Sequence, residues 1–139
     1  MMSKQPFSVG DAVVSCLGAC LGVAAYIVPA LLMHPDRHYN AALFPLLRAG
    51  VEQYSRFTAA ALLFSGAVLG LIRPGRPWLR GFSTIALLPI VSFLEMGMDP
   101  TSHNLFPLEF MCYAVEALPA VLGAYLASRV RTTCSRRGG

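Results

Sequence analysis

The acidic side chains that could do chemistry are concentrated in residues 93–116, FLEMGMDPTSHNLFPLEFMCYAVE. This stretch holds four of the chain's seven carboxylates and one of its three histidines, inside and between two apolar runs. A charge placed in hydrocarbon costs free energy, so an ionisable group in an apolar run is by default a functional-site hypothesis. The predicted polar site comprises Glu95, Asp99, His103, Asn104, Glu109, Glu116 and, from an earlier segment, Arg56.

Two reactive roles fit these residue types. Glu95, Asp99 and His103 could transfer protons, because like charge and a low dielectric shift the pKa of neighbouring acids. The three histidines, His34, His38 and His103, are weak candidates for divalent metal ligands together with the carboxylates. No HExxH motif accompanies them, so the sequence predicts no firm metal site, and it names no cofactor.

A purely structural role is the alternative for the same residues. Asp99 and Asn104 could satisfy backbone groups in the turn between two helices, as Asp and Asn commonly do. In that case, either Arg48 or Arg56 could neutralise Glu95 and Glu109. Paired acids and bases at one depth would then stabilise the fold without any reaction.

Glu116 lies deeper than the other acids. A helix that begins near residue 105 places Glu116 roughly 15 Å further along its axis, at 1.5 Å per residue. A carboxyl group at that depth requires a proton or a hydrogen-bond partner. The candidate partners are Tyr26, Tyr113, Ser65 and Ser92.

The elements that position these residues are predicted to be membrane-spanning helices. The chain has 139 residues, of which 55% are hydrophobic and only 13% are charged, whereas soluble domains carry about 25% charged residues. Four apolar runs, at residues 9–33, 51–72, 82–98 and 105–128, approach the length of about 20 residues that a bilayer requires. We therefore expect an all-α, integral membrane four-transmembrane-helix bundle over residues 1–130, and a disordered cytoplasmic tail over residues 131–139.

The basic residues predict the orientation of this bundle. Positive charge favours the cytoplasmic side of a membrane, and most basic residues precede the first run, lie between the second and third, or follow the fourth. This distribution predicts an N-in/C-in topology in a bacterial inner membrane. The polar site then lies at the outer face, and the basic pI near 9.1 indicates orientation rather than nucleic-acid binding.

Small residues and cysteines suggest how the helices pack. Small residues recur at four-residue spacing, which allows helix backbones to approach closely in lipid; they are Gly18 and Gly22, Gly66 and Gly70, and Ala120 and Ala124. These faces could close the monomer or join it to further copies. The four cysteines lack CxxC or zinc-ligand spacing, so we expect buried free thiols at Cys16, Cys20 and Cys112.

The sequence favours a non-enzymatic role. We expect a binding module or accessory subunit whose outer-face site contacts a lipid, a small hydrophobic molecule, an ion or a partner chain, in a homo-oligomer or a larger membrane complex. The alternative is a small membrane-embedded enzyme or proton-coupled carrier that uses Glu95, Asp99, His103 and Glu116. The extramembrane mass is too small for a soluble catalytic domain.

Overall fold

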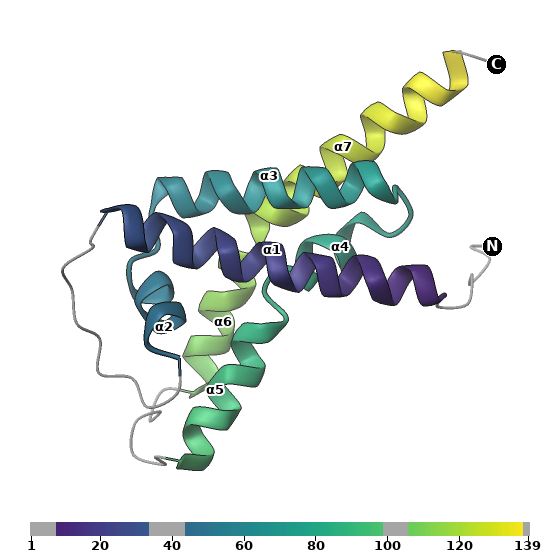
Figure 1. The fold of residues 1–139 in the computed structure, drawn as a ribbon. Coiled ribbons are helices and arrows are strands. Elements are labelled where there is room, and N and C mark those ends of the chain that lie inside the picture. Colours follow the sequence, from purple (N-terminus) through teal and green to yellow (C-terminus); the bar gives the residue numbers. More distant parts are fainter. Residues whose placement is uncertain (1–7, 34–43, 99–105, 138–139) are drawn as a thin grey trace.

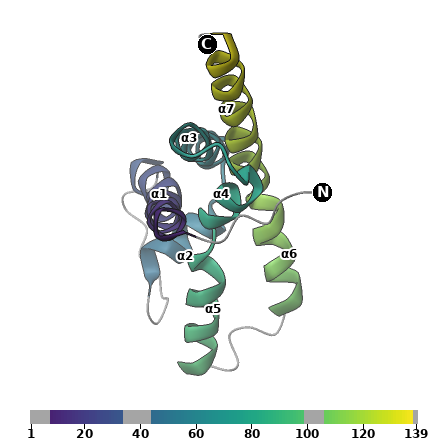
Figure 2. The same ribbon diagram turned by 90° about the vertical axis from the view of Figure 1, so that its right-hand side faces the viewer.

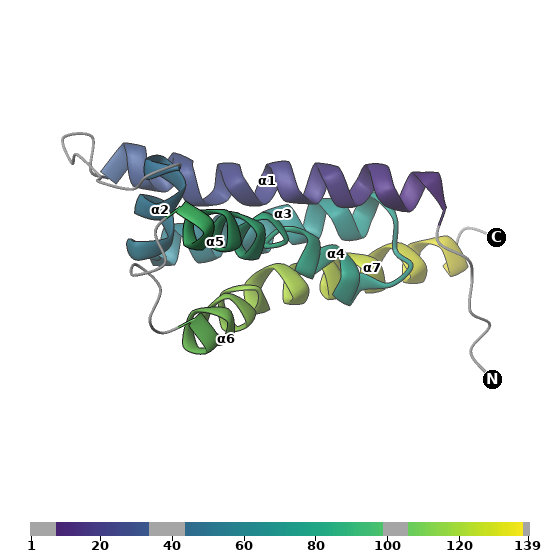
Figure 3. The same ribbon diagram turned by 90° about the horizontal axis from the view of Figure 1, so that it is seen from below.

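The computed structural model describes residues 8–33, 44–98 and 106–137, and every element in these ranges is a helix (Figure 1). The helices are α1 (Val9–Met33), α2 (Pro45–Glu52), α3 (Arg56–Ile72), α4 (Pro77–Ser83), α5 (Leu87–Met98), α6 (Phe106–Glu116) and α7 (Leu118–Arg137). Viewed from below, α1 lies along one side of the molecule and α6 and α7 along the other, with α3, α4 and α5 between them (Figure 3).

Within the described residues, three helical stretches are long and apolar enough to cross a membrane. They are α1, the α4–α5 stretch from Pro77 to Met98 and the α6–α7 stretch from Pro107 to Ser135. The pair α2 and α3 passes the same test together, although the two helices are bent by 106° at the break between them. The chain thus has three helices suited to span a bilayer, or four if the bent pair is one span.

Close backbone contacts join α3 to α7 and α1 to the end of α4. A Cβ atom on Gly66 would clash with the backbone carbonyl of Ala120, and one on Gly70 would clash with that of Ala124. Gly22 lies equally close to the carbonyl of Thr84 at the end of α4. The small residues singled out in the sequence therefore pack inside one chain, and α3 with α7 forms the most extensive helix contact.

Two of the spanning stretches are interrupted near prolines. Residues 84–86 form a turn between α4 and α5, in which Thr84 N donates to Gly81 O and Leu88 N donates to Ile85 O. Pro89 follows this turn and has no N–H to continue the helical pattern. Ala117 likewise separates α6 from α7 just before Pro119. Helices α5 and α6 extend side by side away from α1 and α3 (Figure 2).

Several elements differ from their predicted extents. The run at residues 51–72 contains the end of α2 and all of α3, because Ser55 caps a new helix by accepting a hydrogen bond from Thr58 N at 3.3 Å. α7 continues to Arg137, through most of the segment expected to be a disordered tail. All four cysteines are exposed, so the prediction that Cys16, Cys20 and Cys112 are buried is wrong.

Candidate functional site

Of the predicted site residues, Glu95, Glu109, Glu116 and Arg56 are described by the structure. Asp99, His103 and Asn104 lie outside the described residues, as do the weak metal candidates His34 and His38. Within the described residues, no group of three or more His, Cys, Asp or Glu side chains is arranged to hold a metal ion.

Arg48, on α2, is the centre of the site. Its Nη1 lies 2.8 Å from Oε1 of Glu109 on α6 and 4.0 Å from Oε2 of Glu95 on α5. Its Nε donates to Oε1 of Glu52, one turn further along α2, at 3.2 Å. One guanidinium thus connects three helices that are separate in sequence, and we name Arg48, Glu52, Glu95 and Glu109 the Arg48 cluster.

Tyr113 and Ser92 complete the polar contacts around Glu109. The Tyr113 hydroxyl donates to Glu109 Oε1 at 2.5 Å, and Ser92 Oγ lies 2.9 Å from the same hydroxyl. Ser92 and Tyr113 are both buried, whereas Glu109 is half-buried. Hydrogen bonds to charged groups contribute about 1.5–3 kcal/mol each, so these contacts hold the Glu109 carboxylate in one position between α5 and α6.

Arg48 reaches the carboxylates because of the way α2 packs on α1. Gly50 lies against the backbone carbonyl of Tyr26, where a Cβ atom would clash. The neighbouring Leu47 and Ala49 are buried, so the apolar side of this short helix is fixed and Arg48 projects toward α6. The Arg48 side chain remains 31% exposed and that of Glu52 57% exposed, so the cluster is accessible from one side.

Glu116 has its own partner, one side chain among the four candidates. The hydroxyl of Tyr26, on α1, donates to Glu116 Oε2 at 2.8 Å. Tyr26 is fully buried and its ring lies 6.4 Å from that of Tyr54. Ser65 instead donates to the Ala61 carbonyl. Tyr26 was thus among the four candidate partners of Glu116, but the sequence alone did not distinguish it from the other three.

Arg56 does not join the Arg48 cluster. Its side chain is exposed at the start of α3, with the guanidinium carbon 5.2 Å from the centroid of the Phe57 ring. Arg48 is therefore the residue that pairs with Glu95 and Glu109. Both arginines were candidates from the sequence. Arg48 is the one that pairs, because the backbone contact of Gly50 with Tyr26 fixes the position of α2.

A second buried ion pair lies at the other end of the molecule and was not anticipated. Arg80, on α4, is completely buried, and its Nη2 contacts Oδ1 of Asp11 on α1. Arg73 Nε lies 3.2 Å from the same oxygen, and Arg73 Nη2 donates to Ser8 Oγ at 2.8 Å. Neither Asp11 nor Arg80 was among the predicted site residues; only their proximity in space reveals the pair.

The chemistry available at the Arg48 cluster is that of fixed, paired charges. Its carboxylates are held by an arginine, a tyrosine and a serine, which suits recognition of a charged or polar group at the exposed edge. Comparisons of the chain with protein-family models, curated proteins and solved structures give no match. Function is therefore inferred from the residues of the site itself.

Proposed function

We propose that the chain is a four-span protein of a bacterial inner membrane with both termini in the cytoplasm. Contacts between helix ends support this arrangement. Asp11 at the start of α1 meets Arg73 after the end of α3, so α1 and α3 run in opposite directions. Gly66 and Gly70 of α3 pack in order against Ala120 and Ala124 of α7, so these two helices run in the same direction.

Two helices with the same direction need one crossing of opposite direction between them, which the α4–α5 stretch supplies. The arginines then gather at one end of the molecule, where Arg131 donates to the carbonyl of Ile72 at 2.7 Å. The Arg48 cluster lies near the other end. By the positive-inside rule, the arginine-rich end faces the cytoplasm and the Arg48 cluster faces outward.

We further propose that the protein is a binding module or accessory subunit whose ligand or partner contacts the Arg48 cluster. The observation that carries this proposal is the ion pair of 2.8 Å between Arg48 and Glu109, which ties α2 to α6 while leaving one edge of Arg48 exposed. Glu109 fixes the orientation of the Arg48 guanidinium, and the exposed part of that guanidinium can donate hydrogen bonds to a charged or polar group. Residues 52 and 48 form the edge that a bound group would meet first.

The test is site-specific photo-crosslinking in native membranes. A photoreactive amino acid at position 52 should give one discrete adduct, a protein band for an accessory subunit or a lipid or metabolite mass for a ligand module. The adduct should weaken in the Glu109→Gln variant, because Arg48 then loses its anchor. The same probe at position 64, where Phe64 is 70% exposed on α3, is the matched control. Equal labelling from both positions, or none from position 52, contradicts the proposal.

A proton-coupled carrier is the second candidate, and one observation favours it. Ser92, Tyr113 and Glu109 form a hydrogen-bonded series, and Tyr26 and Glu116 form another further along α6. Glu109 and Glu116 are seven residues apart, two helical turns, so they share a face of this helix. Protonatable groups in a row are typical of proton relays in membranes.

Proton uptake by proteoliposomes distinguishes the carrier from the binding module. A pH-sensitive dye inside the vesicles should report acidification under an imposed gradient if a relay operates. Glu116→Gln should abolish that signal, whereas Arg56→Gln, outside both series, should preserve it. A signal equal to that of empty vesicles excludes the carrier and leaves the binding module.

A further inference from the structure

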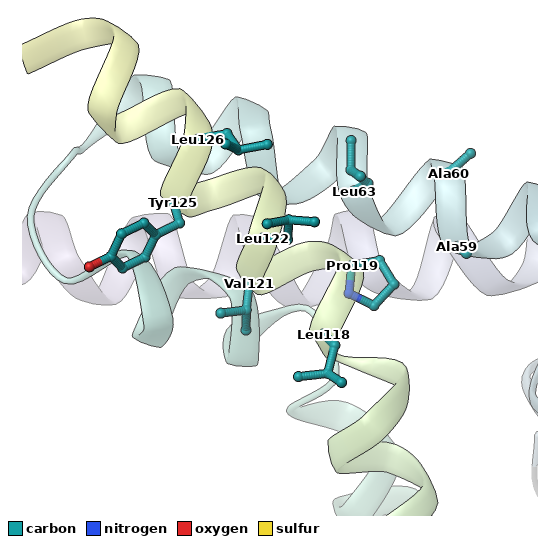
Figure 4. Close-up of a pocket in the computed structure, with 9 residues that line it drawn as sticks. All are labelled: Ala59, Ala60, Leu63, Leu118, Pro119, Val121, Leu122, Tyr125 and Leu126. Carbon is teal, nitrogen blue, oxygen red and sulfur yellow. The ribbon is translucent and has the colours of Figure 1, made fainter. Parts of the chain in front are cut away.

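An apolar groove lies between α3 and α7, and no residue of the Arg48 cluster lines it. It encloses about 710 Å³, within the range of small-molecule sites. Figure 4 shows the residues that line it, with Tyr125 at the end of the groove away from Ala59 and Ala60. The lining residues are Ala59, Ala60, Leu63, Leu118, Pro119, Val121, Leu122, Tyr125 and Leu126.

The Tyr125 ring also lines a second, polar hollow of about 190 Å³. Its other walls are Pro74, from the connection before α4, Pro77, the first residue of α4, and Ser128, Arg129 and Thr132 of α7. Tyr125 therefore lies between an apolar groove on one side and a polar hollow on the other. An apolar surface next to a polar one suits an amphiphile, which has a hydrocarbon tail and a polar head.

Arg129 supplies the charge at the polar end. Its side chain is exposed, and its guanidinium carbon lies 5.5 Å from the centroid of the Tyr125 ring. Among the described residues, the guanidinium N–H groups of Arg129 donate no hydrogen bond. The guanidinium of the neighbouring Arg131, in contrast, donates to the carbonyls of Leu71 and Ile72. Arg129 thus remains available to an anion.

The two hydroxyl groups beside Arg129 are already engaged as donors. Ser128 Oγ donates to the Ala124 carbonyl at 2.6 Å, and Thr132 Oγ1 donates to the Arg129 carbonyl at 2.9 Å. Their hydrogen atoms are therefore directed at the backbone of α7. The arginine is the group in this hollow that selects the charge of a headgroup, and it selects a negative one.

We propose that the groove between α3 and α7 binds an acyl chain of an anionic phospholipid, and that the lipid phosphate lies against Arg129. A lipid fits better than a peptide because α3 and α7 belong to stretches that are apolar enough to cross a bilayer. The charge at the end of the groove distinguishes this site from ordinary lipid contact, because Arg129 attracts the phosphate of an anionic lipid but also repels the choline ammonium of a zwitterionic one. Basic residues near a membrane surface favour anionic lipids in this way.

Native mass spectrometry of the full chain in a mild, lipid-free detergent tests the proposal. The probes are phosphatidylglycerol and phosphatidylcholine with identical acyl chains, and glycerol 3-phosphate as a headgroup without a tail. We expect phosphatidylglycerol to bind at a lower concentration than phosphatidylcholine, and glycerol 3-phosphate not to bind. In Arg129→Gln, phosphatidylglycerol should bind about five-fold more weakly, phosphatidylcholine should lose less, and the preference for phosphatidylglycerol should shrink.

Two further variants separate the tail from the head. Ala60→Phe fills the apolar groove at an exposed position of α3, so it should weaken both phospholipids. Arg56→Gln removes another exposed arginine stacked on an aromatic ring, and it should change neither. Thermal unfolding of each variant in the same detergent verifies that the fold is retained.

Several results would overturn the proposal. Equal binding of the two phospholipids, with no effect of Arg129→Gln, means that charge does not select the ligand. Binding of glycerol 3-phosphate as tight as that of the lipid means that the groove is not used. A dimer that excludes lipid, and that Ala60→Phe dissociates, means that a second copy covers the groove instead.

Discussion

The Oε1 atom of Glu109 accepts hydrogen bonds from both Arg48 and Tyr113, so one substitution tests the whole cluster. Glu109→Gln should lower the free energy of unfolding by about 1–3 kcal/mol, because a charged acceptor becomes a neutral one. Equilibrium unfolding in mixed micelles of a mild detergent and sodium dodecyl sulfate measures this change. Glu52→Gln is the control, since an exposed partner of the same guanidinium should cost less than about 0.5 kcal/mol. Equal losses for the two variants would mean that burial does not matter at this site.

The buried pair of Arg80 and Asp11 makes a comparable prediction at the other end. Arg80→Gln removes a completely buried cation and leaves Asp11 with Arg73 and with its hydrogen bonds from Ser8. The melting temperature should fall further than in Arg73→Gln, where the lost cation is 40% exposed. The double variant Asp11→Leu, Arg80→Met should recover part of the loss, because it leaves no buried charge unpaired; Arg73, which loses Asp11, is 40% exposed. Thermal scans in one detergent compare all three.

At the residue scale, the sequence predicted types of interaction but not individual partners. It placed Glu95 and Glu109 at one end and required a partner for Glu116, and the candidates it offered included Tyr26. It could not choose between Arg48 and Arg56, because the choice depends on how α2 packs against α1. Arg80 and Asp11 are 69 residues apart in sequence, and no local pattern indicates their contact.

At the scale of single helices, glycines distinguish tight contacts from open ones. Gly66→Ala would drive a Cβ atom into the carbonyl of Ala120, so we expect a loss of about 1–3 kcal/mol as α3 and α7 separate. Gly97→Ala, on α5, meets no atom within 4 Å, and it should stabilise the helix by up to about 1 kcal/mol. Unfolding free energies of the two variants provide the comparison. A loss at Gly97 as large as that at Gly66 would contradict the packing of α3 on α7.

Helix existence was predictable because long apolar runs have few alternatives in a bilayer, but helix breaks were not. The range of residues 9–33 is one uninterrupted run, and α1 occupies it. In contrast, the sequence assigned residues 51–55 to the second run. In the structure, Ser55 is the N-cap of α3, so the helix begins only after it. The turn at residues 84–86 lies several residues before Pro89, so the proline alone did not give its position.

At the scale of the whole molecule, the proposed orientation predicts which residues face each compartment. Cys134 is exposed on α7, near the arginine-rich end, and it serves as a natural reporter once the other cysteines are replaced by serine. A membrane-impermeant maleimide should label Cys134 only after the membrane is permeabilised. The Glu52→Cys variant in a cysteine-free background should react in intact spheroplasts. The reverse pattern would place the Arg48 cluster in the cytoplasm.

The contact between Arg131 and the last carbonyls of α3 also has a consequence for biosynthesis. An α-helix leaves its final carbonyl groups without partners, and here Arg131 of α7, 60 residues after Leu71, donates to two of them. A nascent chain that stops before residue 118 therefore carries a helix end that only α7 completes. In a pulse-chase experiment, chains truncated there should be degraded faster than full-length chains, and Arg131→Gln should show an intermediate lifetime. The end of α3 is then completed only after α7 has been synthesised.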